Sequence, residues 1–182
     1  MTRTAVIVFC LCVSSCVSVP LSTIVRMSTF DGRDFAKLDA EVVRVRITLP
    51  QGFGLNVGMR WLGVEAKSAA GVYYGVFELD QEQVRVTHIR GGIFSDTERG
   101  NAYTLRLSAP FRTKFRELQG FVRRAHADEI NIRVVPRLSS FPRDVASAKV
   151  WIDLLLSETQ GYFTLLDAAQ IPLEKIIEQT GS

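Results

Sequence analysis

Apolar and polar residues alternate along much of this 182-residue chain. The clearest case is segment 43–49, where Val43, Val45, Ile47 and Leu49 alternate with arginine and threonine. Segments 103–108 and 130–134 repeat the pattern. Because successive side chains of a strand point to opposite faces of a sheet, this alternation predicts strands with one buried face. Less regular strand candidates lie at 22–28, 59–67, 72–79, 84–90, 150–158 and 162–166.

Short polar and glycine-containing stretches separate these candidates, as turns do. Segment 79–82 joins two of them and predicts a hairpin. About nine short strands with one polar face are typical of antiparallel sheets packed as a sandwich or barrel. We therefore predict a mainly β fold, an antiparallel Ig-like β-sandwich.

One segment follows a different period. Phe111, Phe115, Leu118 and Val122 recur at steps of four, three and four, the stripe of an amphipathic helix. Pro110 suits a first helical turn, where its missing N–H costs nothing. The pattern predicts one inserted helix at about 111–125, crossing between strands to cap an end or edge of the sandwich. Shorter helical turns are predicted at 31–38 and 172–178.

The chain opens with an apolar run that ends at a cysteine. Arg3 precedes apolar residues 5–13, a length that suits a signal peptide and is too short to span a bilayer as a helix. Val13-Ser14-Ser15-Cys16 follows. This motif resembles the lipobox of bacterial lipoprotein precursors. The resemblance implies that signal peptide 1–15 is removed, that the Cys16 thiol is acylated, and that residues 16–21 tether one globular β-rich domain at 22–182.

Two other interpretations of this segment stay open. Val13 and Ser15 also fit the −3 and −1 positions of an ordinary cleaved signal, and the apolar residues alone fit a buried strand of a cytosolic protein. Cysteine usage favours the lipoprotein. Cys10 and Cys12 would leave with the signal, so Cys16 would be the single cysteine of the mature chain. One free thiol is unusual in an oxidising compartment, and acylation removes that difficulty.

The same resemblance suggests where the protein resides. Val17, rather than aspartate, follows Cys16, which in the family's sorting pattern implies the outer membrane with the domain facing the periplasm. Each buried methylene of an acyl chain contributes about 0.8 kcal/mol, so two or more chains anchor a protein stably. We expect the membrane to be one partner, reached through acyl chains on Cys16, and an envelope protein to be another.

Charge is nearly balanced along the chain. The formal charge is +3 and falls to +2 when Arg3 leaves with the signal, which argues against nucleic-acid binding. Seven arginines form a candidate binding surface for anionic lipid or an acidic partner. They are Arg112, Arg116 and Arg123 on the predicted helix and Arg44, Arg46, Arg106 and Arg133 on predicted strands. The alternative, which we favour for both groups, is that the helix arginines form the solvated face of a core-packed helix and that the strand arginines serve solubility and protect sheet edges.

We find no catalytic motif in the sequence. It lacks a nucleophile elbow and a glycine loop that would hold phosphate. His88 and His126 could contribute to a metal site together with a carboxylate, but we predict neither a metal nor a cofactor. We expect a non-catalytic, lipid-anchored binding or scaffold module. The alternatives are an anchored hydrolase acting on envelope material, or a carrier of small molecules or lipids, which would need a cavity of several hundred Å³.

Overall fold

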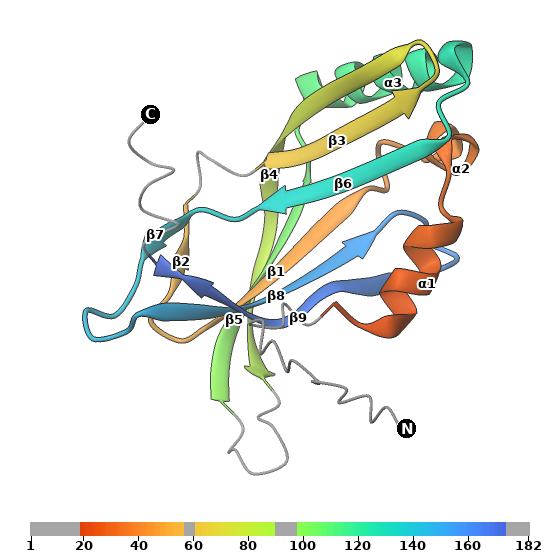
Figure 1. Cartoon of the computed structure of the whole chain (residues 1–182). Coiled ribbons are helices and arrows are strands. Elements are labelled where there is room, and N and C mark those ends of the chain that lie inside the picture. Colours follow the sequence, from red (N-terminus) through yellow and green to blue (C-terminus); the bar gives the residue numbers. More distant parts are fainter. Residues whose placement is uncertain (1–18, 57–60, 90–97, 174–182) are drawn as a thin grey trace, which may run out of the picture.

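The computed structural model describes residues 19–56, 61–89 and 98–173. Within these ranges the molecule is mainly β, with nine strands and three helices (Figure 1). The helices are α1 (Leu21–Thr29), α2 (Gly32–Lys37) and α3 (Ala109–Ala125). The strands are β1 (Arg44–Pro50), β2 (Gly54–Leu55), β3 (Trp61–Ser68), β4 (Gly71–Ile89), β5 (Glu98–Leu107), β6 (Glu129–Val135), β7 (Leu138–Ser140), β8 (Ser147–Leu155) and β9 (Tyr162–Pro172).

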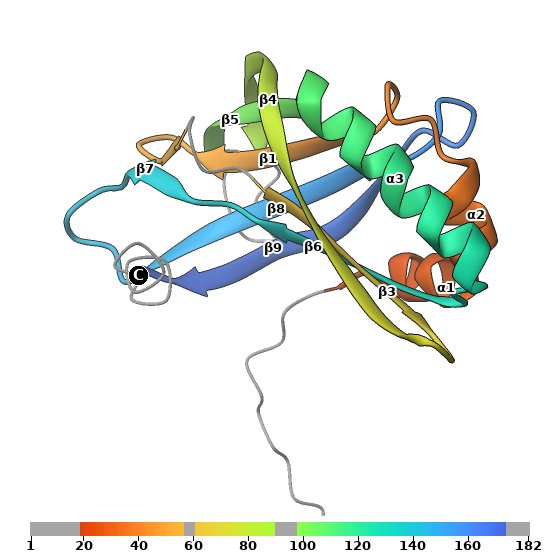
Figure 2. The ribbon, with the colours of Figure 1, turned by 90° about the horizontal axis from the view of Figure 1, so that it is seen from above.

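Seven of the strands form one antiparallel sheet in the order β6-β3-β4-β5-β1-β8-β9, while β2 and β7 pair separately. The sheet curls, and α2 and α3 lie on its inner side (Figures 1 and 2). The predicted mainly β, antiparallel, sandwich-like fold with an inserted amphipathic helix is confirmed.

Strand β1 lies near the middle of the sheet and shows why the pattern was informative. Val45, Ile47 and Leu49 are buried, whereas Arg44 and Arg46 on the opposite face are half-buried. Its register against β5 and β8 brings their apolar residues to the same inner face. This face, with the apolar side chains of β3, β4, α2 and α3, forms the core.

Strand β4 corrects the predicted hairpin. The candidates at 72–79 and 84–90 are one continuous strand, which pairs with β3 in its first half and with β5 in its second (Figure 1). Segment 79–82 contains no residue that favours the positive φ of a tight hairpin turn except Asp80, which pairs with Arg106. Gln81 and Gln83 pair with consecutive β5 residues, so Glu82 is the extra residue of a β-bulge.

Helix α1 corrects a second prediction, the strand at 22–28. The carbonyl of Pro20 accepts hydrogen bonds from the N–H groups of Thr23 at 2.9 Å and Ile24 at 3.1 Å, which begins a helix. β-Branched residues suggested a strand, but their preference depends on packing context. Leu21, Ile24 and Val25 also have helical spacing, so the period of such a short segment was ambiguous.

Helix α3 agrees with the prediction for 111–125. Pro110 lies in its first turn, and Phe115, Leu118 and Val122 are buried. The ring of Phe115 packs against Phe77 of β4, with centroids 5.2 Å apart. The apolar stripe of the helix therefore closes the core on the inner side of the sheet.

Helix α2 confirms the helical turn predicted at 31–38. The side chain of Asp31 accepts the backbone N–H groups of Arg33 at 2.7 Å and Asp34 at 3.1 Å, an N-cap. The bond from Asp34 lowers the pKa of the Asp31 carboxyl below its ordinary value. Gly32 follows, and a β-carbon there would lie 1.7 Å from the carbonyl oxygen of Ala127, so α2 approaches the end of α3 closely.

Part of the sequence-based expectations falls on residues outside the described ranges. The signal 1–15, the acylated Cys16 and Val17 are among these. Of the predicted turn at 172–178, Pro172 ends β9 and Leu173 is buried, while 174–178 lie outside. Residues 16–18 of the predicted tether 16–21 also lie outside, and its last residue, Leu21, is the first residue of α1.

Candidate functional site

The helix-borne arginines contact the segments before β1. Arg112 and Arg116 both bond to the carboxylate of Glu41, Arg116 at 2.9 Å. Arg123 donates to the carbonyl of Ala36 at 3.2 Å. The bonds from Arg112 and then Arg116 lower the pKa of Glu41 below its ordinary value. All three arginines therefore help to hold α3 against α2 and the loop that follows it.

Three of the strand-borne arginines share the outer face of the sheet. Arg44 of β1 lies directly opposite Arg106 of β5, and Arg46 is two residues along β1. Glu82, the bulge residue of β4, accepts two bonds from Arg44 at 2.7 and 3.0 Å and lies 4.0 Å from Arg106. The structure thus brings these arginines together around an acid that offsets part of their charge.

Arg133 is separated from this group. It lies on the edge strand β6, directly opposite Gly63 of β3. Strands β3 and β4 stand between β6 and β5. The four strand arginines therefore do not form one continuous stripe.

Arg46 belongs to a network that sequence patterns did not indicate. It bonds Asp153 of β8 at 3.0 Å, and its guanidinium lies 4.3 Å from the ring centroid of Tyr162. Asp153 also accepts the hydroxyl of Thr164 at 2.7 Å. Burial raises the pKa of Tyr162, an effect that Arg46 opposes. These residues and Trp151 line a broad groove of about 1420 Å³ on the outer sheet face.

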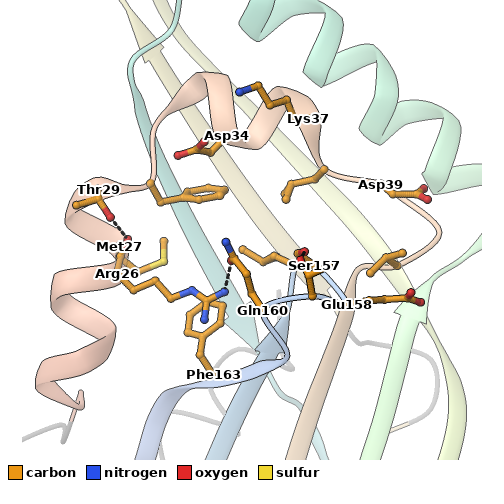
Figure 3. Close-up of a pocket in the computed structure, with 15 residues that line it drawn as sticks. Arg26, Met27, Thr29, Asp34, Lys37, Asp39, Ser157, Glu158, Gln160 and Phe163 are labelled. Carbon is orange, nitrogen blue, oxygen red and sulfur yellow. Dashed lines mark hydrogen bonds between the residues drawn. The ribbon is translucent and has the colours of Figure 1, made fainter.

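A second cavity, of about 690 Å³, lies between α1, α2 and the β8–β9 turn (Figure 3). We call it the α1–α2 cleft. Its lining combines apolar with polar and charged side chains from all three segments. The apolar residues are Met27, Phe30, Leu38, Val42, Leu156 and Phe163, and the polar or charged ones are Arg26, Thr29, Asp34, Lys37, Asp39, Ser157, Glu158, Thr159 and Gln160.

Arg26 fixes one wall of the α1–α2 cleft. Its guanidinium donates to the side-chain oxygen of Gln160 at 2.6 Å and lies 4.1 Å from the ring centroid of Phe163. Figure 3 shows Arg26 reaching from α1 toward these two residues of the β8–β9 segment. A cation–π contact of this kind contributes about 0.5–1 kcal/mol at an exposed site. Arg26 therefore joins α1 to the sheet.

The charged groups at the cleft rim are open to solvent. The carboxylates of Asp34, Asp39 and Glu158 and the ammonium of Lys37 all belong to exposed residues. Phe30 and Leu38 are half-buried, and Leu156 is buried. An apolar floor with a charged rim can bind a molecule that has an apolar part and a polar part.

Sequence reasoning missed the α1–α2 cleft, since 22–28 was predicted to be a strand. Two signals could have pointed toward it. Leu21, Ile24 and Val25 have helical spacing, and Asp31 stands at a position typical of an N-cap. The contribution of the β8–β9 turn comes from long-range packing, which local patterns do not encode.

The two histidines lie far apart along the chain, and His88 is among the residues that line the broad groove on the outer sheet face. His88 is exposed on β4, and His126 ends α3 in a left-handed conformation, with φ 49°. In ranges 19–56, 61–89 and 98–173, no group of three or more His, Cys, Asp or Glu side chains could hold a metal ion. No helix in these ranges is long and apolar enough to cross a membrane.

Comparison of the chain with protein-family models, with curated proteins and with solved structures found no match.

Proposed function

We propose that this chain is a lipid-anchored envelope protein whose folded body works as a non-catalytic binding module facing the periplasm. Acyl chains on Cys16 attach it to the membrane, and Val17 favours the outer membrane. The α1–α2 cleft is the binding site. The observation that carries this proposal is the cavity of about 690 Å³ with an apolar floor and a charged rim.

The dimensions and chemistry of the cleft support a ligand rather than a purely structural role. Small-molecule sites commonly measure about 300–1,000 Å³ and combine apolar walls with a few polar groups. Phe30, Leu38 and Leu156 offer the apolar surface, and Lys37 and Glu158 offer charges of both signs. We infer an amphiphilic ligand, with its apolar part on the floor and its polar part at the rim.

The carboxylates of the α1–α2 cleft fit a binding site better than the active site of a hydrolase. Catalytic carboxyl groups are usually tuned by burial or by a close like charge. Asp34, Asp39 and Glu158 are exposed, so water solvates them. Arg26 is already engaged by Gln160 and Phe163.

The volume of the cleft also favours a second candidate, the carrier of small molecules or lipids. A carrier would enclose its ligand, whereas a binding module would hold a ligand that stays partly exposed. The cleft is lined mainly by two helices, the loop after α2 and the β8–β9 turn, and strand β9 contributes Phe163. This arrangement supports partial exposure of the ligand.

Metabolic labelling with palmitate tests the anchor. The wild-type precursor should incorporate label and Cys16→Ala should not. A double Cys10→Ser, Cys12→Ser variant should label normally, because those residues leave with the signal. Equal labelling of wild type and Cys16→Ala would refute the anchor.

Site-specific photocrosslinking in intact cells tests the cleft. A photoreactive phenylalanine analogue replaces Ser157 in the cleft or, as control, the exposed Ala69 in the β3–β4 turn. The proposal predicts a small-molecule adduct, seen as a discrete mass increase, at position 157 alone. A protein adduct at 157 would indicate a scaffold, and identical products at both positions would refute a specific site.

A further inference from the structure

Helix α1 presents its apolar residues to solvent and a polar residue to the protein. Leu21 is 75% exposed, Ile24 53% and Val25 59%. Thr23, on the opposite face, is 2% exposed and donates its hydroxyl to the carbonyl of Thr164 on β9. A surface helix of a globular protein normally has the reverse arrangement.

The rotation of α1 about its axis is fixed by specific contacts. Thr23 bonds to β9, and Arg26, one turn further, bonds to Gln160 and stacks on Phe163. Positions 23, 26 and 27 face the protein, so positions 21, 24, 25 and 28 form the outward face. Single exposed apolar side chains are common, but three on one face of a two-turn helix form a patch.

The patch begins next to the candidate acylation site. Four residues, 17–20, separate Cys16 from Leu21. Even a fully extended chain spans at most about 18 Å over that distance. An interfacial helix buries its apolar face about 5–10 Å into the boundary between headgroups and acyl chains. A chain anchored at Cys16 therefore holds α1 within reach of the bilayer surface.

We propose that α1 is a second, interfacial membrane contact, in which Leu21, Ile24 and Val25 insert into the phospholipid surface beside the acyl chains. This inference rests on the proposed anchor at Cys16. It implies that the body does not rotate freely on its tether. Because α1 also forms a wall of the α1–α2 cleft, the cleft is held beside the bilayer surface (Figure 3).

The test uses the full-length lipidated protein with a single environment-sensitive dye on an introduced cysteine. Cys16 is acylated in this protein, so Ile24→Cys provides the single free thiol. The matched control is Val72→Cys, a β-branched residue that is 63% exposed in β4. Figure 1 places the β3–β4 turn well away from α1. Each labelled protein is reconstituted into vesicles of phosphatidylethanolamine and phosphatidylglycerol.

The proposal predicts a blue shift and protection from an aqueous quencher at position 24, with neither change at position 72. A dye on Ser28→Cys, a polar position of the same outward face, should show the same blue shift. This variant keeps Ile24, so it excludes a local effect of replacing that residue. A water-like signal at both 24 and 28 in vesicle-bound protein would overturn the α1 contact and leave the anchor intact.

Two other outcomes are distinguishable. Protein that carries no acyl chain and does not bind vesicles would refute the anchor itself, and with it the basis of this inference. A blue shift at position 24 that is already present without vesicles would mean that a second copy or another segment of the chain covers the patch. That result would also overturn the proposal.

Discussion

At the scale of single residues, Gln119 of α3 links two helices. It is buried, and its side-chain amide donates to the carbonyls of Phe35 at 2.9 Å and Leu38 at 2.8 Å. Gln119→Met keeps the volume and removes both donors. The carbonyl of Leu38 then loses its amide donor, and that of Phe35 keeps the N–H of Leu38 at 3.2 Å. Loss of these two bonds should lower the free energy of unfolding by about 1–3 kcal/mol in urea denaturation. Gln170→Met, at an exposed position on β9, should change it by less than about 0.5 kcal/mol. Equal losses would contradict this role.

Glu41 gives the fold a dependence on pH. Its pKa in the folded protein is held below the ordinary 4.5 by Arg112 and Arg116. Because the pKa of Glu41 is lower in the folded protein than in the unfolded chain, its ion pairs stabilise the folded state. This stabilisation is complete at pH values above the ordinary pKa of 4.5. Their contribution is lost as the pH falls through the folded pKa. The melting temperature of wild type should therefore fall further than that of Glu41→Gln between pH 7 and pH 3. High salt should reduce the difference, because the group is exposed. Identical pH profiles would contradict the assignment.

The candidate arginines show what a sequence cannot supply at this scale. Their positions on outward faces followed from the alternation of β1 and β5. Their partners did not, since Glu82 and Asp153 lie 38 and 107 positions from the arginines of β1 that they contact. A surface that looked basic in the sequence is partly offset by acids that only the folded sheet brings near.

At the scale of elements, segments with one regular period of apolar residues were predictable from the sequence, whereas segments in which that period changes were not. The strict alternation of β1 and the helical stripe of α3 each bury one face, so a single period described them. Strand β4 pairs first with β3, up to Glu78, and then with β5, and a bulge lies a few residues after this change, between Gln81 and Gln83. A bulge shifts the period, which is why this strand looked like a hairpin.

The junction of α2 and α3 can be tested with two glycines. Gly32→Ala would place a β-carbon 1.7 Å from the backbone oxygen of Ala127, so the two helices must move apart. We expect the free energy of unfolding to fall by at least the ~1–3 kcal/mol of ordinary overpacking.

Gly120→Ala in α3 is the matched control. Its β-carbon would meet only the flexible end of Arg124, at 3.2 Å. Alanine should raise the free energy of unfolding by about 0.5–1 kcal/mol through helix propensity. Chemical denaturation measures both variants. Changes of the same sign would refute the close approach of α2 to α3.

At the scale of the whole molecule, the sequence predicted the class of fold but not where its cavities lie. The number of strands and their polar faces pointed to an antiparallel β-sandwich, and the structure has a curled, sandwich-like antiparallel sheet. The α1–α2 cleft depends on where a helix, a second helix and the β8–β9 turn meet, and the helices are separated from that turn by more than a hundred residues. No local pattern encodes that meeting.

Two features of the whole molecule combine in the proposed function. In our proposal, acyl chains on Cys16 would supply attachment, and the outward face of α1 would set the orientation of the body. The α1–α2 cleft would then lie at a defined distance from the bilayer, where it could meet the amphiphilic ligand that we propose.

The most direct measurement is the mass of the N-terminal peptide of the mature protein, isolated from native membranes. We predict a peptide that begins at Cys16 and carries the added mass of its acyl chains. A peptide that begins at any other residue, or at an unmodified Cys16, would contradict the proposed anchor.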